Sequence, residues 1–224
     1  MNQPAKAEEG PGPGARRFVK KGKPMVEIRI HGRGGQGNVI AAYLLATAAF
    51  LDGQFSQAFP SFGAERRGAP ITAFVRMDSH VIRRRSQVTS PLFLILQDDG
   101  LFRIPETMAG LLPGGAVLVN SSRTPEELRQ WTREDGLPLG DSVRLVSIAA
   151  TRLAVEEIGK PIPNTVLLSA FVALTGLLSR ESLTKALEGR FSGPLLDGNL
   201  KLAGKAMNLV QTDQWKEVVL VGSH

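Results

Sequence analysis

The sequence predicts an α/β fold: a three-layer α/β/α domain with a largely parallel or mixed sheet. Two observations support this. Candidate strands and helices alternate along most of the chain, and the runs "PLFLILQD" and "GAVLVNS" are apolar almost throughout, which is typical of strands covered on both faces. A third observation is the opening stretch "VEIRIHGRGGQGNVIAAYLLATAAF". It predicts a Rossmann-like unit of strand, glycine turn and helix.

The order of the elements follows from hydrophobic patterning and turn residues. Strands are expected at residues 25–32, 54–59, 71–78, 91–98, 115–121 and 143–150. Helices are expected at 38–51, 124–134, from Asn164 to about Leu178, from about Ser182 to Leu187, and near Asn199–Val210. The second helix has the clearest start, because Thr124 and Glu127 form a capping-box pattern around Pro125.

The chain divides into a tail, a domain and an extension. Residues 1–24 are rich in Pro, Gly and charge without an apolar period, which predicts a disordered basic tail. This tail holds six Lys or Arg against two Glu, so it carries most of the net charge of +6. A solubilising extension is the favoured interpretation, and ordering against a partner is the alternative. Residues 25–210 form the expected domain, followed by a C-terminal extension at 211–224.

Composition excludes several classes of site and protein. Cysteine is absent, so this chain alone cannot form a disulfide, use a catalytic thiol or hold an iron–sulfur cluster. The three histidines are scattered, so no metal site is expected. No apolar run approaches the ~18 residues of a membrane span, and no apolar signal segment opens the chain, which predicts a cytoplasmic protein. The near-neutral body argues against nucleic-acid binding.

The glycine turn is the first candidate site. Its spacing fits the G-x-G-x-x-G pattern, in which backbone N–H groups at a helix start bind a phosphate. A dinucleotide site would also need a carboxylate about 20 residues further on, where this chain has "FSQAFPSFG". A tight strand–helix connection or an anion site for another ligand is therefore favoured over a dinucleotide. The residues of the turn are Gly32, Arg33, Gly34, Gly35, Gln36 and Gly37.

The loop "AFPSFGAERRGAP" is the second candidate site. Arg66 and Arg67 present planar donors that suit carboxylate or phosphate recognition, and Glu65 could orient one of them. A solvated loop is the competing interpretation, which the aromatic residues at 59 and 62 make less plausible. The other candidate loop and interface residues are Phe59, Pro60, Phe62, Gly63 and Gly68.

Two further segments have a weaker interpretation. Arg83, Arg84 and Arg85 are consecutive, so they cannot all contact one ligand, and a solvated or interface edge is expected. Asn164 is a natural N-cap for a helix that is apolar around most of its circumference. Such a helix is buried either in the core or against another subunit, and the subunit interpretation is slightly favoured.

Three blocks of sequence resemble a known family when taken together. "GRGGQGNVIAAYLLATAAFLDG", "QAFPSFGAERRGAPITAFVRM" and "GKPIPNTVLLSAFVALTGLLSRESLTKAL" with "NLKLAGKAM" resemble, in order and spacing, the gamma subunit of 2-oxoacid:ferredoxin oxidoreductases. This family includes the pyruvate, ketoisovalerate, indolepyruvate and phenylglyoxylate enzymes. The resemblance covers roughly residues 25–210.

The resemblance implies an oxidoreductase complex rather than a self-sufficient enzyme. Such complexes convert a 2-oxoacid and coenzyme A to acyl-CoA and CO2, and pass two electrons to ferredoxin or a similar acceptor. Thiamine diphosphate, Mg2+ and [4Fe-4S] clusters are then expected on alpha, beta and delta or ferredoxin-like partner subunits, with no cofactor held by this chain alone. The resemblance identifies no catalytic residue in this chain, so a role of Arg66 and Arg67 in holding the 2-oxoacid or CoA is a physical hypothesis. A structural role of this loop, in bridging subunits, is the equal alternative. The alternative is a free-standing Rossmann-type nucleotide-binding dehydrogenase.

Overall fold

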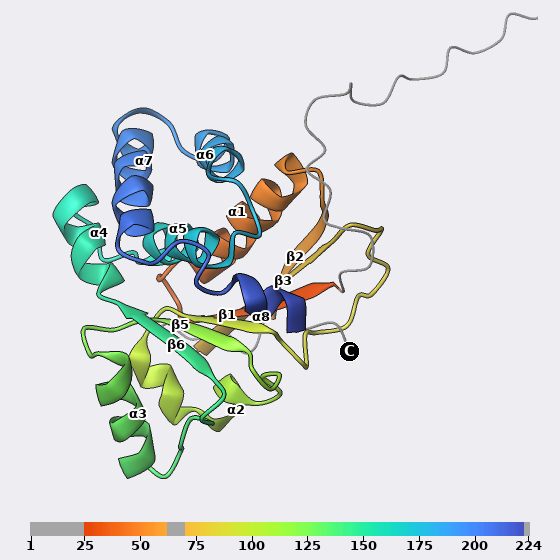
Figure 1. Cartoon of the computed structure of the whole chain (residues 1–224). Helices are drawn as coiled ribbons and strands as arrows, with labels where there is room; N and C mark the ends of the chain where they lie inside the picture. The colour runs from red at the N-terminus through yellow and green to blue at the C-terminus, as the bar shows by residue number, and fades with distance from the viewer. Residues whose placement is uncertain (1–24, 62–69, 222–224) are drawn as a thin grey trace, which may run out of the picture.

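A computed structural model describes residues 25–61 and 70–221 of the chain. Its centre is a six-stranded sheet in the order β2-β3-β1-β4-β5-β6 (Figure 1). The strands are β1 (Val26–Arg33), β2 (Phe55–Ser61), β3 (Pro70–Asp78), β4 (Phe93–Leu96), β5 (Ala116–Asn120) and β6 (Arg144–Ile148). All six lie where the sequence predicts strands, with ends that differ by a few residues.

The sheet is mixed, as expected. Strands β1, β4, β5 and β6 run parallel to one another, whereas β3 pairs antiparallel with both β1 and β2. The sheet therefore has a parallel half and an antiparallel half that meet at β1. Hydrophobic alternation identifies each strand but not its partner, so the position of β2 and β3 beside β1 is information that only the structure provides.

Helices cover the two faces unequally (Figure 1). One face carries α1 (Asn38–Leu51), α4 (Ala150–Ile158), α5 (Asn164–Thr175), α6 (Arg180–Glu188), α7 (Gly193–Asn208) and α8 (Lys216–Val221). The other carries the 3-10 helix η1 (Asp99–Arg103), α2 (Pro105–Met108) and α3 (Pro125–Glu134). This is the expected three-layer arrangement. No helix in the described part of the chain is both long and apolar enough to span a membrane.

Two hydrophobic cores follow from these layers. The larger core joins β1, β3, β4 and β5 to α1, α4, α5, α6 and α7, and the smaller one packs η1 and α3 against the opposite side of β4 and β5. Strands β4 and β5 are thus buried on both faces, which explains why their sequences are apolar without alternation.

Helix α5 corrects the interpretation of the apolar helix at Asn164. Every residue from Asn164 to Thr175 is buried within this chain, because α5 packs against α1, α4, α6, α7 and α8. The apolar circumference is therefore explained by the core, and no second subunit is needed to cover it. The helix ends at Gly176, whose φ of 57° forms a left-handed C-cap.

The residues after 210 contribute to the larger core. Trp215 is 1% exposed and stacks on Phe93 of β4, with ring centroids 6.2 Å apart. Val218 in α8 is also fully buried. The segment expected as a C-terminal extension thus packs on the same domain as residues 25–210.

Other differences from the predicted elements are local. Strand β6 ends at Ile148 and helix α4 begins two residues later, where the sequence suggested one strand continuing to residue 150. Helix α7 begins at Gly193, six residues before the expected start. The capping box of α3 is confirmed: the Thr124 N–H donates to Glu127 Oε2 over 2.7 Å, and the Glu127 N–H donates to Thr124 Oγ1 over 3.2 Å.

Candidate functional site

The carboxyl ends of β1 and β4 form the switch point of the sheet. From β1 the chain passes to β2 and β3 on one side, and from β4 it passes to β5 and β6 on the other. In α/β sheets the crevice outside such diverging strand ends is the usual place for a ligand. The glycine turn 32–37 follows β1 and the residues Gln97 to Asp99 follow β4, so both lie at this edge.

The glycines of the turn have conformational and packing roles. Gly35 and Gly37 have φ angles of 94° and 79°, in the left-handed region that other residues adopt only at a cost. A Cβ at Gly32 would lie 3.2 Å from the Cβ of Asn38, and one at Gly37 would lie 2.7 Å from Nδ2 of Asn164. The turn therefore allows β1, α1 and the start of α5 to approach closely.

A carboxylate lies against the turn. The Arg33 N–H donates to Gln36 Oε1 over 2.7 Å, and the side chains of Arg33 and Gln36 each place a nitrogen 3.4 Å from Asp98 Oδ2. Asp98 Oδ1 accepts the N–H of Gly100 over 2.9 Å, which fixes the carboxylate at the start of η1. Because Asp98 already pairs with Arg33, the turn's cation is partly neutralised and attracts a pyrophosphate less strongly.

Gln97, the first residue after β4, also forms hydrogen bonds with the turn. It is fully buried, and its backbone N–H donates to the carbonyl of His31 over 2.9 Å. In the amide orientation that pairs both side-chain atoms, Gln97 donates to the carbonyl of Gln36 and accepts the N–H of Asn38 over 3.2 Å. The first N–H of α1, which a phosphate would otherwise occupy, then has a partner inside the protein.

The polar network continues along the strand ends of β5 and β6. Asn120 donates to the carbonyl of Gln97 over 3.0 Å and pairs with Thr151 at the start of α4. Asp99 accepts hydrogen bonds from Ser121 Oγ at 2.6 Å and Arg123 Nη1 at 2.7 Å. The sequence interpretation missed these residues. The available signal was that polar residues stand at the ends of two successive buried strands, β4 and β5.

Asn164 joins the glycine turn to α5, as the close approach at Gly37 requires. Its Nδ2 donates to the carbonyl of Gly37 over 3.4 Å, and its Oδ1 accepts the N–H of Thr165 over 2.8 Å. Asn164 is 5% exposed, so its role within this chain is to connect the starts of α1 and α5. The predicted N-cap is shifted by one residue, since the structure places Pro163 at that position.

The second candidate site lies mostly outside the described residues, which exclude Phe62, Gly63, Glu65, Arg66, Arg67 and Gly68. Of the remaining two candidates, Pro60 belongs to β2, and Phe59 of β2 packs 5.2 Å from the Phe74 ring. The two described residues that flank the loop are Ser61 and Pro70. Pro70 pairs with Arg33 across β3 and β1, so this end of the loop starts at the same edge as the glycine turn.

Titratable groups at the edge include one strongly perturbed histidine. His31 is 7% exposed on the sheet face opposite α1, and burial, together with the nearby Arg29 charge, lowers its pKa to about 3. Its Nδ1 lies 3.3 Å from Thr72 Oγ1. A histidine that stays neutral down to acidic pH is suited to a structural role rather than to proton transfer near neutrality.

The described residues therefore define a braced strand edge rather than a complete catalytic centre. They contain no group of three or more His, Cys, Asp or Glu side chains that could hold a metal ion. The fold and the edge together define a mixed α/β domain with a Rossmann-like first unit, whose glycine turn is contacted by the side chains of Gln97 and Asp98.

Comparison with known proteins gives the family. The chain belongs to the pyruvate ferredoxin/flavodoxin oxidoreductase family, whose model matches residues 27–209. This confirms the resemblance seen in the three sequence blocks. It supports an oxidoreductase subunit and does not support the alternative of a free-standing Rossmann-type dehydrogenase.

Three similar proteins illustrate the relationship. The pyruvate synthase subunit PorC of Methanothermobacter marburgensis is 46% identical over 179 residues, which are 80% of this chain and 94% of the relative. The pyruvate/ketoisovalerate oxidoreductases common subunit gamma of Thermococcus kodakarensis is 44% identical over 82% of this chain and 96% of its own. The crystal structure of the Thermotoga maritima pyruvate oxidoreductase subunit PORC matches with a TM-score of 0.71 and 34% identity, covering 83% of this chain and 97% of that one.

Proposed function

We propose that this chain is the gamma subunit of a multi-subunit 2-oxoacid:ferredoxin oxidoreductase. The complex would convert a 2-oxoacid, with pyruvate and branched-chain 2-oxoacids as first candidates, and CoA to acyl-CoA and CO2. Two electrons would pass to ferredoxin or a similar acceptor. The observation that carries this proposal is identity of about 45% over nearly the whole length of relatives named as pyruvate and ketoisovalerate oxidoreductase subunits.

The redox and carbon–carbon bond chemistry would be carried by partner chains. Thiamine diphosphate with Mg2+ would supply the nucleophile for decarboxylation, and [4Fe-4S] clusters would supply one-electron transfer. This chain does not fit either group, because its sequence contains no cysteine and its described residues offer no metal-binding cluster. We therefore assign it no step that forms or breaks a bond of the substrate.

This chain would contribute by forming one side of the active site of the complex. The hydrogen bonds that link Gln36, Asp98 and Gln97 hold the turn, α1 and the end of β4 in one arrangement. A fixed edge of this kind can present the loop at 62–69 to a neighbouring subunit without reorganisation on binding. On that loop, Arg66 and Arg67 would hold an anionic group of the 2-oxoacid or of CoA, with Glu65 orienting them.

Co-expression with the candidate alpha, beta and delta chains tests the proposal. The purified assembly should reduce ferredoxin only when a 2-oxoacid and CoA are both present, and this chain should co-elute with its partners in size-exclusion chromatography. A self-sufficient monomer that binds NAD(H) and oxidises a substrate unaided would refute it.

The loop hypothesis needs a separate test in the assembled complex. R66Q and R67Q should raise the KM for the 2-oxoacid or for CoA while assembly is retained, because each removes one charge-assisted donor pair. R133Q is the matched control, since Arg133 is an exposed arginine on α3. Unchanged kinetic constants for both substrates in both loop variants would exclude the binding role and leave the main proposal intact.

A further inference from the structure

The antiparallel half of the sheet has one face that helices leave largely uncovered. In β1, β2 and β3 the side chains that point away from α1 are mainly polar or charged, and they include Glu27, Arg29, His31, Gln57 and Arg76. The parallel half, in contrast, is packed on both faces by apolar residues. A polar face is common in antiparallel sheets, but here Arg29, His31 and Arg76 are buried, so other parts of the chain must cover the face.

A single irregular segment, residues 79–92, crosses this face between β3 and β4; we name it the arginine strap. It is fixed to the sheet at both ends of β2. Gln57 Nε2 donates to the carbonyl of Ile82 over 3.0 Å, and Gln87 Nε2 donates to Ser61 Oγ over 3.1 Å. Val88, a residue of the strap itself, is buried. The backbone of the strap is therefore held in place although it has no regular secondary structure.

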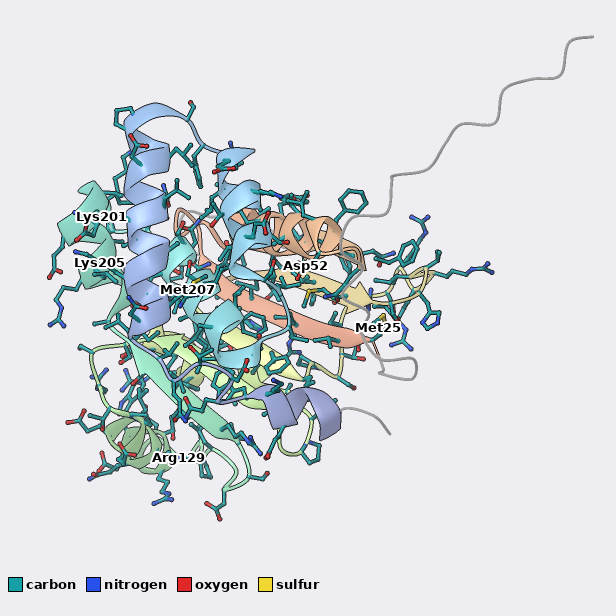
Figure 2. All side chains as sticks on the ribbon, turned by 45° about the horizontal axis from the view of Figure 1, so that its top comes forward. Met25, Asp52, Arg129, Lys201, Lys205 and Met207 are labelled. Atoms are coloured by element: carbon teal, nitrogen blue, oxygen red, sulfur yellow. The ribbon has the colours of Figure 1, made fainter. Side chains whose placement is uncertain are left out.

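The strap presents three cations to solvent. Its fourteen residues include Arg83, Arg84 and Arg85 and contain no Asp or Glu. All three arginines are exposed, and the Arg84 side chain is 58% exposed. Figure 2 shows nitrogen-tipped side chains reaching outward from this yellow segment, away from the body of the domain.

Two carboxylates of the sheet contact the strap, fewer than its three arginines: Asp78 accepts the N–H of His80, and Glu27 lies beside Arg84. Glu27 Oε1 accepts from Arg76 Nε over 2.7 Å and lies 3.5 Å from Arg84 Nη1, so one carboxylate serves two guanidinium groups. Arg76 is fully buried, and in the described part of the chain its Nη1 and Nη2 have no hydrogen-bond partner. The positive charge of Arg76 is only partly balanced, which strengthens the positive potential at the strap above it.

Apolar side chains border the same surface. Phe55 is 47% exposed at the start of β2 and pairs with Asp78, the last residue before the strap. Val81, three residues further on, is 63% exposed. Arginine beside exposed aromatic and aliphatic side chains is typical of protein–protein interfaces, whereas a nucleic-acid site would favour a longer basic surface that contacts several phosphates.

We propose that the arginine strap, with Phe55 and Val81 at its margin, docks a carboxylate-rich surface of a partner subunit of the complex. Pre-positioning of the backbone reduces the entropy lost when the arginines bind, so exposed side chains can still contribute to assembly. The inference rests on the proposed function, since it names the surface through which this subunit would join that complex.

Charge reversal on the strap tests the inference. The variant R83E/R85E leaves the Glu27–Arg84 pair in place and should weaken the binding of this chain to the co-expressed alpha and beta chains on the order of tenfold at about 50 mM salt. R83K/R85K, which preserves charge, should bind nearly as well as the wild type. R133E/R180E, on α3 and α6, is the control with the same charge change at exposed positions elsewhere.

The outcomes separate this inference from the proposed function. Loss of affinity in R83E/R85E but not in R133E/R180E, with the same melting temperature in both, supports the docking surface. Equal affinity of R83E/R85E and the wild type overturns it while the proposed function stands. Failure of the wild-type chain to bind these partners overturns both the docking surface and the proposed function. If R83E/R85E loses DNA binding but keeps subunit binding, the strap is a nucleic-acid site and the inference is overturned.

Discussion

Replacing His31 with glutamine should reduce the acid sensitivity of this fold. His31 lies on the charged face of β1, 7% exposed, and its Nε2 has no hydrogen-bond partner in the described part of the chain. Burial and the Arg29 charge lower its pKa to about 3. The folded state therefore resists protonation at a position where the unfolded chain would accept a proton readily.

The sign and size of the effect follow from the two pKa values. The unfolded histidine has a pKa of about 6.5, so below that pH the unfolded state binds more protons and the free energy of unfolding decreases. The stability that the neutral His31 allows is fully present above about pH 6.5, and it is lost progressively as the pH falls toward the pKa of the folded state. At about pH 5 the loss should be roughly 2 kcal/mol from this one side chain.

Urea denaturation near pH 7 and near pH 5 measures this loss. The wild type should lose more stability than H31Q between the two conditions, by roughly 2 kcal/mol. H80Q is the control, because the His80 side chain is 73% exposed and its replacement changes no buried group. Equal losses in wild type and H31Q would refute the assignment of acid sensitivity to His31.

Three further substitutions test the packing around the edge and the core. G37A should destabilise the fold by roughly 2 kcal/mol more than G53A in thermal denaturation. Both glycines have positive φ, but of the two only Gly37 lacks space for a Cβ. Equal destabilisation by G37A and G53A would show that the contact at Gly37 is unimportant. If the residues after 210 belong to the core, W215A should lower the free energy of unfolding by about 3–5 kcal/mol. W131A, at a partly exposed tryptophan, should lower it less, and urea denaturation midpoints measure both. D52A should cost about 1–2 kcal/mol because Asp52, at the end of α1 (Figure 2), accepts three hydrogen bonds from the start of α6; an unchanged melting temperature would contradict this.

The positions of most elements were predictable because their signals are local. Helix 38–51 has the expected ends, since a glycine turn precedes it and Gly53 follows it closely. The capping box at Thr124 is also a local signal. Helix α4 was missed because the apolar end of β6 runs directly into its first residues, Ala150 and Thr151, which hides the change of period.

Which residues contact an element in the folded chain is not a local property, and the sequence predicts it less well. An apolar circumference shows that α5 is buried but not what covers it. The pattern is therefore compatible both with burial against another subunit and with burial in the core of this chain. The G-x-G-x-x-G spacing shows that backbone N–H groups are available at a helix start. It does not show that Gln97, about sixty residues later, accepts the first of them, or that Asp98 contacts the side chains of Arg33 and Gln36. Those two residues are placed there by the parallel pairing of β4 with β1.

Omission and add-back of this chain in the reconstituted complex tests the central claim most directly. The rate of ferredoxin reduction by a 2-oxoacid and CoA should be negligible without this chain and restored in proportion to its addition, with saturation at one fixed ratio to the partner chains. The same rate with and without the chain, or turnover by this chain in isolation, would contradict the account.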